Sequence, residues 1–280
     1  MPNTPIGIMQ GRLSPPEAGR FQSFPRWSWQ DEFARARDAG LDYIEWIYDD
    51  YGASVNPIAS AQGRERIVAE SAEYKVNVPA ICADWLMDFP VLRCSASERH
   101  EREQIFHQLL KWGADIQVSR IVLPFVDASS MKGSVEKDIV IGVLESALPL
   151  AERFRVELHL ETDLNPQDFA DFLTRIDHPL VKVNYDSGNS SGLGYIARDE
   201  FSAYGKRIGS IHLKDRLRNP DGSVQTRPLG EGSADFDDLF ASIRRIGYTG
   251  GFTLQVARGS DGDEVNWAKQ QAAFVRSHWK

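Results

Sequence analysis

Four stretches in the second half of the chain alternate apolar and polar residues in the manner of β-strands. They are residues 156–163, 181–189, 208–216 and 251–259. Because successive side chains of a strand point to opposite sides, the apolar residues of each stretch share one face and the polar residues share the other. In the first stretch the polar face carries Glu157, His159 and Glu161. Near their carboxyl ends, the four polar faces include Glu161, Asp186, His212 and Gln255.

The rest of the chain repeats an alternation of strand-like and helix-like segments. Earlier strands are predicted at 5–10, 41–50, 76–83 and 120–126. Helices are predicted at about 28–39, 59–74, 97–112, 135–153, 166–176, 199–206, 236–246 and 264–278. The Gly/Ser-rich segment 187–194 predicts a loop, and Asn-Pro-Asp-Gly at 219–222 predicts a small hairpin or loop excursion. Eight strand–helix units predict an α/β fold, a single-domain (β/α)8 TIM barrel over residues 1–280.

The four polar strand ends are candidates for a metal site. In a barrel of this kind the active site lies at the carboxyl ends of the strands, so these side chains are expected to converge. Two carboxylates, an imidazole and an amide oxygen suit one divalent metal ion. This set of donors does not distinguish among Mn, Mg, Co and Zn. The alternative is that Glu161 and Asp186 are solvated acids at loop ends and His212 is a hydrogen-bonded histidine of the barrel.

The overall composition narrows the class of protein. The 280 residues are 42% hydrophobic and 26% charged, which is enough for a large core. The net charge of −8 argues against a nucleic-acid partner, because a phosphate-binding face needs an excess of Lys and Arg. No window approaches the roughly 18 apolar residues of a membrane helix, and the N-terminus does not read as a signal peptide. A cytoplasmic location is expected, with Cys82 and Cys94 as reduced thiols.

Several short motifs together resemble a known superfamily. They are LHLETD at 158–163, NYDSGN at 184–189, IHLKD at 211–215 and PLGEGSADF at 228–236. Their order and spacing resemble the xylose isomerase-like TIM barrels, which include sugar and sugar-phosphate isomerases and epimerases and also endonuclease IV. The resemblance covers nearly the whole chain. Endonuclease IV is set aside because its trinuclear zinc site needs several additional histidines at barrel positions where this chain has none.

The resemblance assigns metal-binding positions residue by residue. The family's metal-binding Glu, Asp and His fall on Glu161, Asp186 and His212. The fourth ligand, a Glu in the epimerases, falls on Gln255, whose amide oxygen can bind a metal but whose amide cannot exchange a proton. A further departure is Asn189, which stands where the epimerase pattern has His.

The resemblance implies proton abstraction next to a carbonyl, giving an enediolate that the cation stabilises as a Lewis acid. Glu161 is the remaining base, so one-base isomerisation of an aldose or ketose fits better than two-base epimerisation. Lys214, or Asp215, is the candidate second proton donor for an epimerisation. Two alternatives stay open. One is an inosose-type dehydratase, and the other is a non-catalytic sugar-binding barrel in which Gln255 marks lost catalysis.

Other side chains are expected to bind the sugar or sugar phosphate at the barrel mouth. The predicted substrate-binding residues are Gln10, Arg12, Trp46, Trp85, Asn189, Arg216 and Arg258. Indole rings pack on the apolar faces of sugars, and arginines grip phosphate or carboxylate bidentately. Core packing of the tryptophans and surface pairing of the arginines are the competing interpretations. The aromatic segment 21–29 is either a dimer contact or a lid, so a homo-oligomer is left open.

Overall fold

Eight parallel strands close into a barrel in the computed structural model, which describes residues 4–279. The strands are β1 (Ile6–Met9), β2 (Tyr43–Ile47), β3 (Asn77–Cys82), β4 (Arg120–Phe125), β5 (Glu157–Thr162), β6 (Val181–Asp186), β7 (Ile208–Leu213) and β10 (Phe252–Leu254). Each pairs with the next in chain order, and β10 pairs with β1 to complete the ring. The predicted (β/α)8 barrel is confirmed. The predicted domain of 1–280 includes residues 1–3 and 280, which lie outside the described residues.

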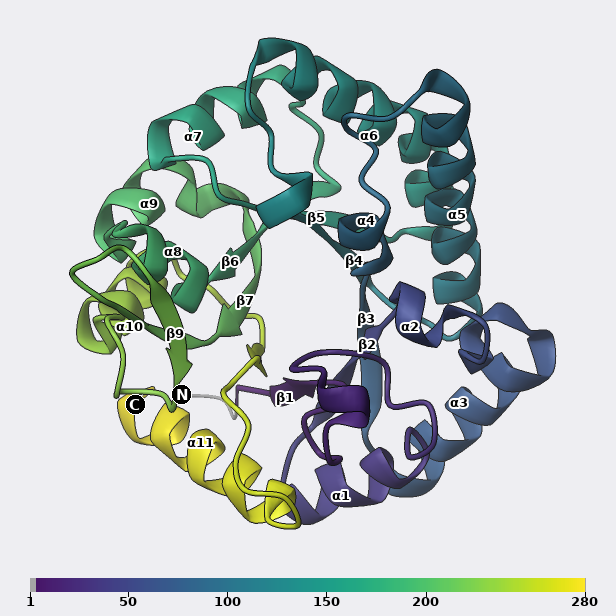
Figure 1. Ribbon diagram of the computed structural model, residues 1–280, viewed down its shortest axis with the longest axis vertical. Helices are drawn as coiled ribbons and strands as arrows, with labels where there is room; N and C mark the ends of the chain where they lie inside the picture. The colour runs from purple at the N-terminus through teal and green to yellow at the C-terminus, as the bar shows by residue number, and fades with distance from the viewer. Residues whose placement is uncertain (1–3, 280) are drawn as a thin grey trace.

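A ring of helices surrounds the barrel (Figure 1). The longer ones are α1 (Asp31–Ala39), α3 (Ala61–Tyr74), α5 (Ala96–Asp115), α6 (Ser134–Phe154), α7 (Pro166–Arg175), α9 (Ala197–Tyr204), α10 (Phe236–Arg245) and α11 (Glu264–His278). Single-turn 3-10 helices lie at Glu17–Gly19, Pro57–Ala59, Asp127–Ser129 and Gly205–Arg207. Among the described residues, no helix has both the length and the apolar character that crossing a bilayer requires.

Local signals set most helix ends close to the predicted positions. Gly40, with a φ of 70°, ends α1 in the left-handed conformation that glycine favours. Asn165 caps α7 by accepting a hydrogen bond from the Asp168 amide, and Pro166 occupies the first turn. The predicted start of α5 at Ser97 is wrong by one residue, because Ser95 and Glu98 form a capping box that starts the helix at Ala96.

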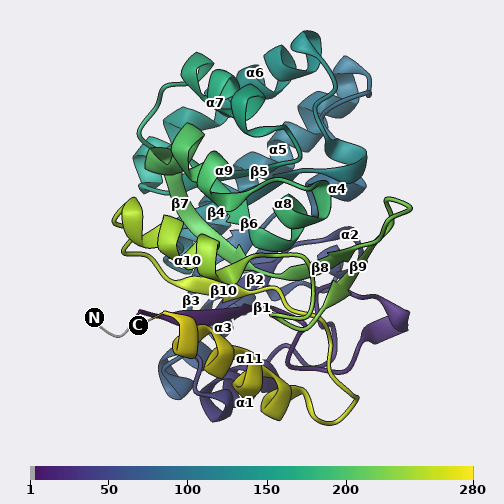
Figure 2. The ribbon, with the colours of Figure 1, turned by 90° about the vertical axis from the view of Figure 1, so that its left-hand side faces the viewer.

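Shorter elements gather at the carboxyl ends of the strands. They are α2 (Asp50–Ala53), α4 (Trp85–Asp88), α8 (Ser187–Leu193) and the antiparallel hairpin of β8 (Asp215–Arg218) and β9 (Val224–Arg227). Figure 2 shows α4, α8 and the hairpin at one end of the barrel, with the two termini at the other. The hairpin confirms the turn predicted at 219–222, and this end of the barrel is where the candidate site lies.

The prediction of a loop at 187–194 is wrong, because most of this segment forms α8. Asp186 caps the helix by accepting a hydrogen bond from the Asn189 amide at 2.8 Å, and Gly194 ends it with a φ of 84°. Gly188 packs so tightly on Lys214 that an added Cβ would lie 2.6 Å from the lysine Cγ. Glycine weakens an isolated helix, but at position 188 it is needed for the close approach of α8 to Lys214, the residue after β7.

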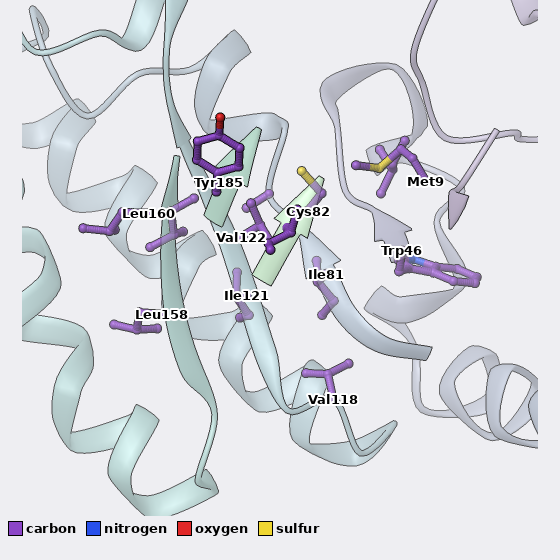
Figure 3. Close-up of a cluster of buried hydrophobic side chains, with 14 of the residues drawn as sticks. Met9, Trp46, Ile81, Cys82, Val118, Ile121, Val122, Leu158, Leu160 and Tyr185 are labelled. Carbon is purple, nitrogen blue, oxygen red and sulfur yellow. The ribbon is translucent and has the colours of Figure 1, made fainter. Parts of the chain in front are cut away.

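The core lies between the strands and the surrounding helices. Figure 3 shows Leu158 and Leu160 of β5 beside Ile121 and Val122 of β4, and all four are buried. Leu158 and Leu160 lie on the apolar face that the alternation along β5 predicts. The polar faces consequently point into the barrel, where His159 and His212 are both fully buried.

Candidate metal centre and active site

Glu161, Asp186 and His212 meet at the carboxyl ends of β5, β6 and β7. One donor atom from each lies within 4.8 Å of the others. All three are buried, with exposures of 5%, 3% and 0%. The period of two along each strand places the three side chains on the inner face, and parallel pairing brings the strand ends together. The structure thus places these predicted ligands in one cluster.

Two polar atoms of this cluster are buried without a hydrogen-bond partner among the described residues. They are Asp186 Oδ2 and His212 Nδ1. Leaving such atoms unpaired is costly, so their pairing is the rule in folded proteins. Both belong to the group whose donors converge, and His212 Nδ1 lies 3.5 Å from Glu161 Oε2. The oxygen and nitrogen donors fit a divalent cation, which would satisfy both unpaired atoms.

Glu45 fixes the imidazole of His212 from behind. Its Oε1 atom lies 2.7 Å from His212 Nε2, which leaves Nδ1 facing Glu161. Thr253 donates to Glu45 Oε2 at 3.2 Å, and Arg120 lies 3.6 Å from the same oxygen. A carboxylate on the far nitrogen is the usual support of a metal-binding histidine, because it fixes ring orientation and raises basicity. No pattern in the sequence indicates this role of Glu45.

The charges of this group are strongly coupled. Burial lowers the pKa of His212, but the carboxylates of Glu45 and Glu161 outweigh it and raise the pKa to about 10. Burial raises the pKa of Glu45, whereas His212 and Arg120 bring it down to about 2. The carboxylates therefore make the site strongly attractive to a positive charge beside His212 Nδ1.

Glu161 is held as an ionised carboxylate. Asn184 Nδ2 donates to its Oε2 at 2.8 Å, and Asn189 Nδ2 donates to its Oε1. Burial raises the pKa of Glu161, but His212 and Lys214 more than offset that effect, so the pKa lies below its usual range. An ionised, oriented carboxylate can serve both as a ligand and as a base.

Gln255 and Lys214 adjoin Glu161, Asp186 and His212. Lys214 Nζ lies 3.4 Å from Gln255 Oε1, 3.4 Å from Asn189 Oδ1 and 3.9 Å from Asp186 Oδ2. The amide nitrogen of Gln255 donates to Gln22 Oε1 at 3.0 Å, so the amide oxygen is the atom that faces the cluster. Burial lowers the pKa of Lys214, even though Asp186 opposes this effect.

A cavity of about 240 Å³ opens beside the cluster. It is far larger than the roughly 30 Å³ share of one water molecule. The predicted site residues in its lining are Glu161, Asn189, Lys214, Arg216 and Gln255. Gln22, Cys82 and Asp84 also line it. Gln22 comes from the long loop after β1, where no periodic pattern pointed to the cavity.

Arg12 and Arg258, predicted to bind substrate, instead bind the loop after β1. Both donate to the carbonyl of Phe21, Arg12 through Nη1 at 2.6 Å and Arg258 through Nε at 2.9 Å. Arg12 also donates to Gln22 Oε1 at 2.9 Å. The two guanidinium groups lie outside the cavity lining and hold in place the loop that carries Gln22.

Gln10 and the two predicted tryptophans also lie outside that lining. Gln10 is fully buried and accepts a hydrogen bond from the Ile47 amide at 2.9 Å. Trp46 is fully buried too, with its ring against Trp29 and its indole nitrogen bonded to Asn56. Trp85 packs on Phe89 with ring centroids 4.7 Å apart. All three therefore contribute to packing in this structure.

Asp215 lies beneath the loop that follows the hairpin. Its carboxylate accepts hydrogen bonds from the amides of Gly230, Gly232 and Ala234 at 3.0, 2.8 and 3.1 Å. It is fully buried and does not line the cavity. These bonds give Asp215 a structural role in shaping residues 230–234.

A family model for xylose isomerase-like TIM barrels matches residues 33–278. The chain belongs to the xylose isomerase-like TIM barrel family. Among its relatives in this family is L-ribulose-5-phosphate 3-epimerase UlaE of Salmonella paratyphi C. The two are 23% identical over 259 residues, which cover 90% of this chain and 87% of that protein.

Solved structures share the fold. The IOLI protein with a zinc atom superposes with a TM-score of 0.77 at 17% identity, over 99% of each chain. D-psicose 3-epimerase of Clostridium cellulolyticum H10, with D-tagatose, gives a TM-score of 0.77 at 14% identity, again over 99% of each chain. The relatedness to L-ribulose-5-phosphate 3-epimerase supports an enzyme of the isomerase and epimerase class.

Proposed function

We propose that this protein is a divalent-metal-dependent isomerase or epimerase of a sugar or sugar phosphate. The observation that carries the proposal is a pair of buried atoms without hydrogen-bond partners among the described residues, Asp186 Oδ2 and His212 Nδ1. Both converge with Glu161, which lines the cavity. The names of the relatives, which act on L-ribulose 5-phosphate and on ketohexoses, support the choice of substrate class.

Glu161, Asp186 and His212 would hold the cation, with the amide oxygen of Gln255 as a fourth donor. A bound divalent cation supplies Lewis-acid stabilisation of negative charge on a substrate oxygen. Because the donor set mixes carboxylate and imidazole, it suits Mn, Mg, Co and Zn alike.

Glu161 is the proposed base. It removes a proton from the carbon next to the substrate carbonyl, and the C–H electron pair moves into an enediolate. Asn184 and Asn189 orient the carboxylate through their hydrogen bonds to its two oxygens. Lys214, whose ammonium group lies in the same cavity wall, stabilises negative charge that develops on the substrate.

Arg216 is the proposed contact for a phosphate or other anionic group. Its side chain is half-buried in the cavity lining. Within residues 4–279, its guanidinium group makes no hydrogen bond or ion pair with another side chain, whereas Arg12 and Arg258 are both engaged with backbone carbonyls. A planar fork of this kind suits bidentate binding of phosphate.

Solvent deuterium exchange tests the proposal. The protein is incubated in D2O with ketopentoses, ketohexoses and their phosphates, with Mn²⁺, Mg²⁺, Co²⁺ or Zn²⁺ added in turn, and exchange next to the carbonyl is followed by NMR. We expect deuterium exchange in the presence of metal. A chelator should abolish this exchange, and added metal should restore it. The Glu161→Gln variant should show none. If none of the sugars exchanges deuterium under any metal condition, the proposal is contradicted. Loss of water from a substrate would indicate a dehydratase.

A further inference from the structure

Asp84 places a second carboxyl group in the wall of the cavity. It follows β3 and occupies the N-cap position of α4, where an aspartate ordinarily accepts a hydrogen bond from the helix backbone. Here the side chain makes no such bond. It lines the cavity instead, together with Glu161. The side chain therefore faces the cavity and does not cap the helix that it precedes.

Two side chains hold the Asp84 carboxyl group in that position. Gln22 Nε2 donates to Oδ2 at 2.7 Å, and Cys82 Sγ donates to Oδ1 at 3.0 Å. Burial is the main cause that raises the pKa of Asp84 to about 6, against the opposing effect of these two hydrogen bonds. Both protonation states are then accessible near neutral pH, as a group that gives and takes protons requires.

Gln22 connects Asp84 to the position of Gln255. Its amide nitrogen binds Asp84, while its amide oxygen accepts a hydrogen bond from Gln255 Nε2 at 3.0 Å. Gln255 itself has no proton to exchange. Asp84 and Gln255 are therefore linked through one residue, Gln22. Asp84 lies at one end of these hydrogen bonds, and the Gln255 amide, which is no acid, lies at the other.

Glu161 belongs to a separate hydrogen-bond network. Its oxygens are bonded to Asn184 and Asn189, which lie at β6 and α8. Asp84 is bonded to residues of β3 and of the loop after β1. The two carboxyl groups therefore face one cavity from different parts of its wall, which is the arrangement that two-base chemistry on one carbon needs.

We propose that Asp84 is the second acid–base residue and that the enzyme inverts a carbon next to the substrate carbonyl. Glu161 removes the proton from one face of that carbon, and the C–H electron pair forms the enediolate double bond. The protonated Asp84 then gives its proton to the opposite face as the carbonyl re-forms. Glu161 is left protonated and Asp84 ionised, and exchange with water restores both. This inference rests on the proposed function and specifies it as epimerisation.

The test compares Asp84→Asn with wild type on both members of an epimeric ketose pair in D2O. In the variant, Glu161 still removes the proton of one epimer, so that epimer continues to exchange deuterium. The other epimer needs Asp84 as its base, so its exchange falls by about 100-fold or more. Interconversion of the two falls by the same factor. Asp88→Asn, on the exposed side of α4, is the matched control and keeps both exchange reactions.

Other results would overturn the inference. Equal loss of exchange for both epimers, with unchanged thermal stability and metal content, would indicate a different role for Asp84. Unchanged interconversion would exclude it as an acid–base group. Wild-type protein that exchanges protons and yields only the aldose would refute the epimerisation while leaving the proposed function intact. A wild type that exchanges no proton would refute the proposed function itself.

Discussion

Two buried histidines in the barrel differ in how their ring nitrogens are paired. His159 and His212 are both fully buried on inward-facing strand positions, and each has a glutamate as a partner. His159 uses both nitrogens, bonding Ser210 at 2.7 Å and Glu157 at 2.8 Å. His212 forms a hydrogen bond only through Nε2, and its Nδ1 faces Glu161 and Asp186 without a hydrogen-bond partner among the described residues.

The pKa values of the two histidines also differ. Burial lowers the pKa of His159 to about 4, whereas two carboxylates raise the pKa of His212 to about 10 against the effect of burial. A satisfied, neutral histidine completes the polar interior of the barrel. An unpaired nitrogen among carboxylates is what a cation site requires. Residue type and burial therefore do not distinguish a structural histidine from a candidate metal-binding histidine. The hydrogen bonds of the two ring nitrogens do.

The largest expected effect comes from removing one histidine or the other. His212→Ala removes a ligand and should lower metal affinity by at least about 1,000-fold, with proton exchange lost in parallel. His159→Gln should leave metal affinity within about tenfold and instead lower the free energy of unfolding by about 1–3 kcal/mol, through its two lost hydrogen bonds. Metal titration and chemical denaturation of both variants check this. Similar metal affinity in the two variants would contradict the different roles assigned to His159 and His212.

Glu45→Gln should have the next largest effect. The amide keeps the shape of the side chain but removes the charge behind His212, so metal affinity should fall by about 10- to 100-fold. Competition with a chromogenic chelator measures the change. If the variant binds metal as tightly as wild type, Glu45 does not act through the imidazole.

Glu200 sharpens the comparison because it also has a buried oxygen without a partner. Its Oε1 accepts hydrogen bonds from Ser190 and Tyr204, both at 2.8 Å, and its Oε2 is unpaired among the described residues. Burial raises its pKa to about 7, so the side chain can carry a proton there. It is absent from the converging group of Glu161, Asp186 and His212. One unpaired oxygen, without further ligands around it, indicates protonation and not a cation.

This predicts a pH dependence of stability. Because the folded-state pKa of Glu200 lies above the unfolded value of 4.5, the folded protein keeps a proton that the unfolded chain releases. The stabilisation is complete below about pH 4.5 and is lost as the pH rises to about 7, by about 3 kcal/mol. Denaturation of wild type and Glu200→Gln at several pH values should show their difference changing in this window. A constant difference would contradict the assignment.

Gln255→Glu should have the smallest effect. The carboxylate adds a negative charge close to the three ligands, so metal affinity should rise by between about two- and tenfold, limited by the neighbouring Lys214. The same metal titration measures it. Weaker binding would show that residue 255 does not face the cation.

The sequence predicted the barrel and the convergence of Glu161, Asp186 and His212 for one physical reason. Alternation along β5, β6 and β7 determines which side chains face inward, and parallel pairing determines that their ends meet. Both facts are local to the strands. The bounds of α11, predicted as 264–278, are likewise local, and the structure has them at Glu264–His278.

The features that the sequence did not predict depend on distant partners. Every residue of β2 is buried, so no alternation shows that Trp46 faces the helices while Glu45 faces His212. The roles of Arg12 and Arg258 depend on the carbonyl of Phe21, which lies in an irregular loop. The segment 187–194 has only one strong helix former, Leu193, and becomes helical through the Asp186 cap and contact with the barrel.

Calorimetric titration of the chelator-treated protein with Mn²⁺ tests the central claim most directly. We predict one site per chain in wild type and in His159→Gln, and none in His212→Ala, with all three proteins folded by circular dichroism. Absence of binding to wild type, or equal binding to His212→Ala, would show that Glu161, Asp186 and His212 do not form a cation site.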